Sequence, residues 1–288
     1  MAAEVSQDRA ERPAGPPAGV AQARGAPFEK PVFDETWATI GIGAGLVPSY
    51  SGSDDMRVFP LPLIVGRVGG IGISPNGPGF NLDLLSAAPP ANGPPSTKPS
   101  FSFGPAFRFR NDRANQVEDE VVELAEPLDT AFEIGASAGI SFPGVLRPGD
   151  RLGVSTQVRW DVLGAHDGML VEPSVSYFTP VGRAASLQLS ANAGFVDDSY
   201  ADYYYSVTPA QSADTGLPEF TADGGLDLLG LVAIGTYDLD GNALNGGFSI
   251  YAIGGYSRLQ GDGADTPFTS QRGSADQFLA GLGVGYTF

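Results

Sequence analysis

The chain of 288 residues contains no cysteine, which excludes a disulfide framework and thiolate chemistry. It also has no apolar run that approaches the roughly 18 residues of a transmembrane helix. Charged residues make up only 17% of the chain, and 33 acidic residues outnumber 16 basic ones, giving a formal net charge of −17. A chain this acidic lacks the basic face that binds phosphates, so we expect no nucleic-acid partner.

Glycine is abundant instead, with 40 residues, and its weak helix propensity argues against an all-helical fold. Short alternating segments separated by turn residues indicate an all-β fold. The last segment alternates between a bulky apolar set and a smaller set, namely Phe278, Ala280, Leu282, Val284, Tyr286 and Phe288 against Gln277, Leu279, Gly281, Gly283, Gly285 and Thr287. Because successive side chains of a strand point to opposite faces, one face of this strand is bulky and the other is small.

The same alternation recurs along the chain, at residues 38–46, 101–109, 132–142, 152–162 and 187–195. The second face carries Gly, Ser, Asn and Gln with few charges, whereas the exterior of a soluble barrel is rich in Lys and Glu. This composition favours a wet or hydrogen-bonded lumen, with the apolar face turned to lipid. Aromatic residues lie at segment ends, as in interfacial girdles, at Trp37, Phe142, Trp160, Phe195, Tyr237, Tyr256 and Phe288.

An open sheet in lipid would leave its edge groups unsatisfied, so the pattern predicts a closed, transmembrane, antiparallel up-and-down β-barrel. We predict twelve strands, at residues 36–47, 56–66, 69–75, 78–86, 100–110, 130–142, 151–163, 168–179, 184–196, 224–238, 247–259 and 274–288. Single-chain bacterial barrels have an even number of strands, and this parity is the main reason for including the short third strand.

Even parity places both termini in the periplasm of a multi-pass protein of the bacterial outer membrane. Residues 1–34 are then a flexible periplasmic tail and residues 35–288 the barrel, in contact with outer-membrane lipid and lipopolysaccharide. The tail lacks the apolar core of a signal peptide, so we expect that a signal has been removed. Outer loops are predicted at 48–55, 76–77, 111–129, 164–167, 197–223 and 260–273, and periplasmic ones at 67–68, 87–99, 143–150, 180–183 and 239–246.

Three stretches resemble a known family. They are Val47-Pro-Ser-Tyr-Ser-Gly-Ser-Asp-Asp55 with Pro60-Leu-Pro-Leu63, Asp198-Ser-Tyr200 with Tyr204-Tyr-Ser-Val-Thr-Pro-Ala-Gln211 and Thr215-Gly-Leu-Pro-Glu-Phe220, and Tyr256-Ser-Arg-Leu259 with Gly261-Asp-Gly-Ala-Asp-Thr-Pro267. Together they are similar to the MipA/OmpV family of MltA-interacting outer-membrane proteins, over about residues 35–288. The acidic loop 111–129 and the N-terminal tail are not part of that pattern.

The resemblance implies an outer-membrane barrel that acts as a scaffold between a lytic transglycosylase and a murein synthase. Other members of the family are linked to adhesion and to osmotic or antibiotic response. Tyr286 and the terminal Phe288 also resemble the C-terminal signal by which the outer-membrane assembly machinery recognises its substrates.

His166 is the sole histidine and lies in the tight turn Gly164-Ala-His-Asp-Gly168. A catalytic base there would need a nucleophile within hydrogen-bond reach, and no spacing to Ser51 or Asp198 supports one. We therefore interpret His166 as a turn residue and expect no enzymatic activity. One histidine without cysteine disfavours zinc, and we expect no cofactor and no metal.

Charged residues fall on or near the predicted inward face, at Arg108, Arg110, Glu133, Arg159, Asp161, Glu172 and Arg258. They could form a constriction that selects ions, or an ion-pair network that fills a narrow lumen. The acidic segment 118–126 and other outer-loop acids could bind Ca²⁺ or be solvated, and their spacing fits no EF-hand. A tyrosine cluster in the longest loop could bind a partner or fold that loop over the barrel mouth, at Tyr200, Tyr203, Tyr204 and Tyr205.

Two functions follow from these residues. The first is a non-enzymatic scaffold, or a surface-interaction protein, with a filled lumen. The alternative is a narrow outer-membrane channel for small solutes or ions.

Overall fold

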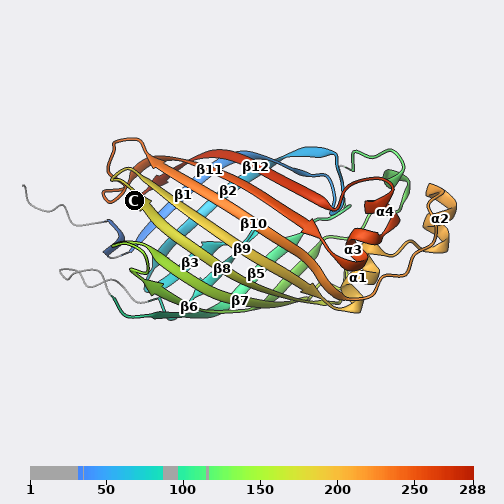
Figure 1. Cartoon of the computed structure of the whole chain (residues 1–288), viewed down its shortest axis with the longest axis horizontal. Coiled ribbons are helices and arrows are strands. Elements are labelled where there is room, and N and C mark those ends of the chain that lie inside the picture. Colours follow the sequence, from blue (N-terminus) through green and yellow to red (C-terminus); the bar gives the residue numbers. More distant parts are fainter. Residues whose placement is uncertain (1–31, 35, 87–96, 115–116) are drawn as a thin grey trace, which may run out of the picture.

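A computed structural model describes residues 32–34, 36–86, 97–114 and 117–288. Within them, twelve antiparallel strands form one closed sheet in which each strand pairs with its neighbours in sequence, and β1 pairs with β12 (Figure 1). The strands are β1 Trp37–Pro48, β2 Met56–Val68, β3 Ile71–Pro75, β4 Gly79–Asp83, β5 Ser100–Arg110, β6 Ala131–Pro143, β7 Arg151–Asp161, β8 Met169–Val181, β9 Ala185–Val196, β10 Gly225–Asp238, β11 Gly247–Leu259 and β12 Asp276–Thr287. The predicted up-and-down barrel and its strand number are confirmed.

The predicted strand bounds differ from the observed ones by a few residues, and hydrogen bonds explain the clearest case. β7 ends at Asp161 rather than 163, because the Asp161 carboxylate accepts the backbone N–H of Leu163 and Ala165 and bends the chain into a turn. Most of the predicted tail 1–34 and most of the predicted periplasmic loop 87–99 lie outside the described residues.

The outward face of the barrel is an apolar belt. Phe278 and Leu282 on β12 are 60% and 61% exposed, and Ile42 on β1 is 68% exposed, as the alternation predicted. Exposure of this kind is unfavourable in water and favourable in hydrocarbon, so the belt is a lipid-facing surface. No helix in the described part of the chain is long and apolar enough to cross a membrane.

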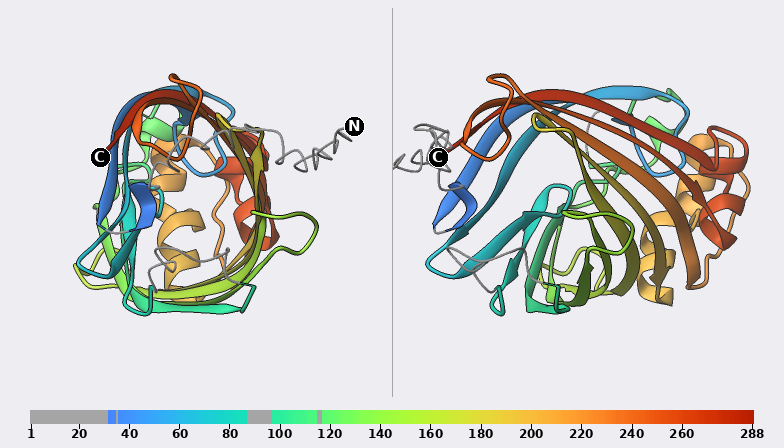
Figure 2. Two further views of the ribbon diagram at one scale, coloured as in Figure 1. Left: turned by 90° about the vertical axis from the view of Figure 1, so that its left-hand side faces the viewer. Right: turned by 60° about the vertical axis from the view of Figure 1, so that its left-hand side comes forward.

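The two ends of the barrel differ. The end that holds the C-terminus, which we call the turn end, has connections such as residues 69–70 and 182–184. The opposite end, which we call the cap end, carries helices α1 Asp198–Tyr205, α2 Pro209–Thr215, α3 Gly261–Asp265 and α4 Pro267–Ser270, and the 3-10 turn η2 Val122–Leu124. A second 3-10 turn, η1 Val32–Asp34, precedes β1. Seen from the turn end, α1 and α3 lie across the far mouth of the barrel (Figure 2).

Hydrophobic packing holds the cap together. One buried cluster joins the loops after β1, β5, β9 and β11, with Tyr50, Val122, Ala125, Val207, Leu217 and Phe268. A second cluster packs α1 against the barrel rim, with Leu170, Tyr200, Ala201, Tyr204, Tyr205 and Ala222. These clusters give the cap end a core of its own, and sequence alternation does not reveal it.

Part of the lumen wall is made of glycine. Several inward positions of β1 and β12 are glycines, namely Gly41, Gly43, Gly45, Gly281, Gly283 and Gly285. A Cβ on Gly283 would lie 2.3 Å from the ring of Tyr251, whose hydroxyl donates to the Leu61 carbonyl at 2.8 Å. The glycines therefore leave the space that the Tyr251 ring occupies, and we call this surface the glycine wall.

Candidate functional site

Five of the predicted lumen residues lie together on adjacent strands. Strand pairing sets Arg108 of β5 opposite Glu133 of β6, and Gln157 of β7 opposite Glu172 of β8. Their inward side chains form a network, Arg108, Arg110, Glu133, Arg159 and Glu172, which we call the charged wall. These residues lie on β5 to β8, which follow one another in the sequence and pair side by side. Because each of them occupies an inward position of its strand, the strand pairing brings their side chains together.

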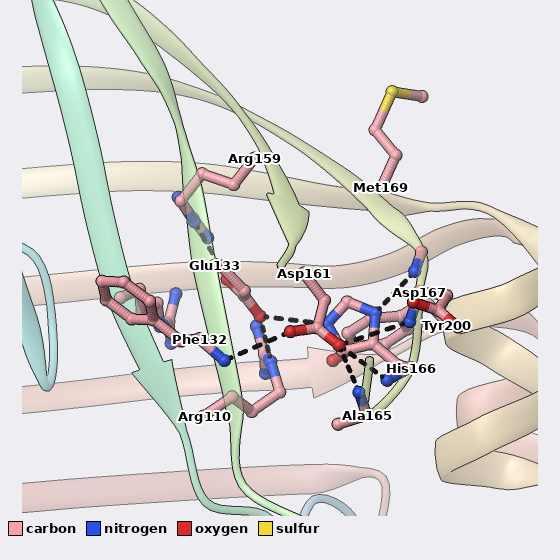
Figure 3. Close-up of polar contacts among 12 residues, drawn as sticks. Arg110, Phe132, Glu133, Arg159, Asp161, Ala165, His166, Asp167, Met169 and Tyr200 are labelled. Atoms are coloured by element: carbon pink, nitrogen blue, oxygen red, sulfur yellow. Dashed lines mark hydrogen bonds and ion pairs between the residues drawn. The ribbon is translucent and has the colours of Figure 1, made fainter. Parts of the chain in front are cut away.

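Glu133 is the centre of the charged wall and has no exposed surface. It accepts from Arg110 Nε at 2.7 Å and from Arg159 Nε at 3.0 Å (Figure 3). Arg159, which is 1% exposed, also donates through Nη1 to Gln157 at 2.7 Å and through Nη2 to Glu172. Buried charges are tolerated only when they are paired and hydrogen-bonded, as these are.

Arg108 is the least satisfied arginine of the charged wall. Its Nη1 lies 3.3 Å from Glu172, and its Nε is buried without a hydrogen-bond partner. The turn between β3 and β4 reaches this site, because Asn76 donates to Gln157 at 2.9 Å. The network therefore contains three guanidinium groups and two carboxylates, and its spare donor capacity lies at Arg108.

Asp161 has the predicted inward position but does not join the ion pairs. Its carboxylate accepts backbone N–H groups from Phe132 and from the turn that contains His166, including His166 N at 3.0 Å. His166 is buried, and its Nδ1 accepts from Gly168 N at 3.0 Å. Its Nε2 lies 3.6 Å from Glu133, without a hydrogen bond. The geometry places His166 in a turn against the charged wall, with its ring centre 5.1 Å from that of Tyr200 and 5.6 Å from that of Tyr204.

The prediction that Arg258 faces the lumen is wrong. Arg258 has the parity of the outward residues Phe248, Ile250 and Tyr256 of β11, and it pairs with Asp276 at 2.8 Å on the outer rim. The sequence of β11 indicates the outward position of Arg258, because residues two apart in a strand share a face and Tyr256 faces outward.

The tyrosine cluster lies on α1 and attaches the cap to the charged wall. The guanidinium of Arg110 lies 5.1 Å from the Tyr200 ring centre and 5.9 Å from that of Tyr204. The Tyr205 hydroxyl donates to Asp227 at 2.6 Å, and the Tyr203 hydroxyl accepts from Asp129 N at 2.8 Å. Burial raises the pKa of the Tyr200 hydroxyl well above its usual value, so this phenol stays neutral. Tyr200, Tyr204 and Tyr205 are buried, an arrangement that folds the longest loop over the mouth.

A second cap contact joins loops 153 residues apart in sequence. Asp119, in the acidic loop, accepts from the backbone N–H of Val121 and Val122 and pairs with Arg272 at 2.8 Å. Burial opposes the charge of Asp119, but the hydrogen bonds from Arg272 and from the two backbone groups prevail and lower its pKa. Sequence reasoning did not find this pair, because nothing local relates the two loops.

The cap helices also escaped prediction, although their sequences contain signals. Thr208 and Gln211 form a capping box at the start of α2, with Pro209 in the first turn. Asp197 caps α1 by accepting from Tyr200 N. The expectation that the protein binds no metal and no cofactor stays a prediction. Within the described ranges, no three His, Cys, Asp or Glu residues are grouped so that they could hold a metal ion.

A cavity of about 690 Å³ lies beneath the cap. Its lining includes the charged-wall residues Arg108, Arg110 and Glu172, the α1 residues Tyr200 and Tyr205, and residues of β1, β2 and β9 to β12. The volume is within the range of small-molecule sites.

Comparison with known proteins gives one family and several structures of similar architecture. An outer membrane channel from Pseudomonas putida F1 aligns at 13% identity and a TM-score of 0.43, over 88% of this chain and 96% of that chain. OmpT of Vibrio cholerae aligns at 9% identity and a TM-score of 0.36, over 88% and 97%. The CymD monoaromatic hydrocarbon channel aligns at 10% identity and a TM-score of 0.36, over 89% of each chain. No curated protein matches the sequence. Residues 40–288 match the family model described as MltA-interacting protein MipA, and the chain therefore belongs to the MipA family.

Proposed function

We propose that this protein is a non-enzymatic scaffold in the bacterial outer membrane, with both termini in the periplasm. Its partners in this proposal are a lytic transglycosylase of the MltA type, which the family description names, and a murein synthase. The observation that carries the proposal is the packed cap, whose two hydrophobic clusters lie over one mouth of the barrel.

The surroundings of His166 support the non-enzymatic part. A general base must reach the proton that it removes, directly or through one water. His166 Nδ1 accepts from a backbone N–H, and Nε2 faces Glu133 in a buried setting. A hydrolase role predicts that His166→Ala abolishes turnover of lipid or peptide substrates, and such a loss would contradict the proposal.

Two measurements test the scaffold. The full chain in lipid nanodiscs should retain a purified MltA-type transglycosylase, whereas nanodiscs with an unrelated barrel should not. In planar bilayers the same protein should give no defined open-channel steps. Absence of retention together with clear channel steps would exclude the scaffold with a filled lumen.

The cavity beneath the cap favours a second candidate, a narrow channel for small solutes or ions. Charged side chains that line a constriction set ion preference, and Arg108 and Arg110 line this cavity. If the protein conducts, Arg108→Glu should shift its selectivity toward cations. Unchanged selectivity in a conducting Arg108→Glu variant would count against the channel.

A further inference from the structure

The barrel wall has an incomplete stretch between β2 and β5. Within the described residues, β2 pairs with β3 only through Gly66, Arg67 and Val68, although β1 pairs with β2 from Met56 to Arg67 on the other side. β3 and β4 are five residues long each, so the hairpin they form ends well below the cap. In the right-hand panel of Figure 2, β2 and this short hairpin diverge. Residues 56–65 of β2 thus form an edge inside a closed barrel.

Two prolines fit this edge. Pro60 and Pro62 lie in the part of β2 that pairs with β1 but not with β3, and proline is confined to strand positions whose nitrogen faces no partner. An edge strand in lipid would otherwise present unsatisfied donors. Proline also prevents the edge from adding a strand from a second copy of the chain. The motif Pro60-Leu-Pro-Leu63 takes no part in the cap or in the charged wall. Its two prolines fit a strand edge that has no pairing partner among the described residues.

The gap has defined borders. The β3–β4 turn, with Pro78, forms its lower border, and Phe109 N donates to the Pro78 carbonyl at 3.1 Å. Above it, Arg57 Nη2 donates to Asn111 O at 3.4 Å, and Ser51 N donates to Asp112 at 2.9 Å. Residues from all of these borders also line the cavity beneath the cap, so the cavity lies directly behind the gap.

The borders combine positive charge with apolar surface. Arg57 lies at the upper border, and the Arg108 guanidinium lies beside the β3–β4 turn, 3.6 Å from the position of a Cβ on Gly77. Arg108 Nε is buried without a partner. Phe59 lines the inner side of the gap, and the outward face nearby carries the exposed Val58 and Phe109. Both arginines have acidic neighbours, since Arg108 pairs with Glu172 and Asp112 lies at the upper border, so the opening is polar and charge-balanced rather than purely apolar.

We propose that this gap is a lateral portal through which a single-chain amphiphile with a carboxylate headgroup passes between the membrane and the cavity. The carboxylate binds the exposed part of the Arg108 guanidinium, whose side chain is 25% exposed and lines the cavity, through a charge-assisted hydrogen bond. The acyl chain lies over Phe59 and leaves through the gap beside β2. This proposal does not rest on the scaffold function, and it uses the same cavity and the same Arg108 as the channel candidate.

Photolabelling of the full chain in lipid nanodiscs tests the portal. The probe is a palmitate that carries a diazirine in its chain, and labelled peptides are identified by mass spectrometry. We expect labelling concentrated on residues 56–65 and 106–112, with much less on the lipid-facing residues Leu189 and Leu231, which are also exposed. Excess laurate should compete, whereas methyl laurate and dodecyltrimethylammonium should not, because they lack the anionic head.

Two variants sharpen the test. Arg108→Gln should lower the labelling of residues 56–65 by roughly ten- to hundred-fold, the range for loss of a hydrogen bond to a charged group. Arg183→Gln, an exposed arginine at the turn end, is the matched control and should leave labelling unchanged. Uniform labelling around the belt, or equal competition by methyl laurate, would overturn the proposal on the unmodified chain alone. Cross-links between copies through β2 would also overturn it, since they would identify a second barrel as the occupant.

Discussion

The charged wall and the glycine wall line the same lumen by opposite means. The charged wall fills space with long ionic side chains that satisfy one another, such as Glu133 between Arg110 and Arg159. The glycine wall leaves side chains out and lets one ring, Tyr251, lie over the backbone of β1 and β12. The first depends on charge balance and the second on shape, so the two walls should respond differently to substitution.

The difference also concerns the cap. Tyr200 and Tyr204 of α1 pack on Arg110, so α1 is in direct contact with the charged wall. The loop after β11, on the side of the glycine wall, reaches across through Arg272 to Asp119. The charged wall therefore contacts the cap directly. The loop that leads into the glycine wall is joined to the acidic loop of the cap by the Asp119–Arg272 ion pair, which we call the latch.

The largest effect is expected from Glu133→Gln. This change leaves Arg110 and Arg159 facing a neutral group in a buried setting, and breaking a buried ion pair destabilises a protein by about 3–5 kcal/mol. Urea unfolding in lipid vesicles, followed by tryptophan fluorescence, measures the loss. Glu120→Gln, which neutralises an exposed acid of the cap, is the control and should leave the unfolding midpoint unchanged. Equal midpoints for the two variants would show that the charged wall contributes no net stability.

A smaller effect is expected from Gly283→Ala on the glycine wall. The added methyl group meets the Tyr251 ring, and overpacking of this kind costs about 1–3 kcal/mol. The same unfolding assay applies. Gly254→Ala on β11 is the control, because a Cβ there meets no atom within 4 Å.

A double variant tests the cause. In a Tyr251→Ala background the ring is absent, so Gly283→Ala should cost less than it does in the native chain. Additive effects of the two substitutions would contradict the shape argument for the glycine wall.

The sequence predicts the barrel and one of the walls well, for a physical reason. Lipid outside and a polar lumen inside impose a two-residue period on every strand, and this period reveals both strands and inward charges such as Arg108 and Glu172. The prediction placed Arg258 in the lumen, although the same two-residue period puts it on the outward face together with Tyr256. The Asp119–Arg272 latch joins residues 153 apart, and no local pattern encodes such a contact. The open edge of β2 arises because residues 56–65 have no partner on the β3 side in the described part of the chain. The alternation of side chains along a strand does not show which neighbours that strand pairs with.

The latch gives a pH-dependent prediction. The folded state lowers the pKa of Asp119, so the contact contributes stability above the unfolded pKa of about 3.9 and loses it as pH falls through the folded value. Amide hydrogen exchange of Val121 and Val122, which donate to Asp119, should therefore show less protection at acid pH once intrinsic exchange rates are corrected. Asp119→Asn should remove most of this pH dependence, and a variant that keeps it would place the titrating group elsewhere.

The smallest effect is expected from Arg258→Ala, on the outer rim beside the glycine wall. Arg258 and Asp276 are 54% and 41% exposed, so solvent screens their ion pair, and exposed pairs contribute little. The unfolding midpoint should match that of the native chain within error, in contrast to the large loss from Glu133→Gln. Because the guanidinium lies outside the lumen, ion selectivity of any conducting form should also be unchanged. A large shift in either measurement would mean that Arg258 turns inward in the membrane, and the charged wall would then extend around the barrel to β11.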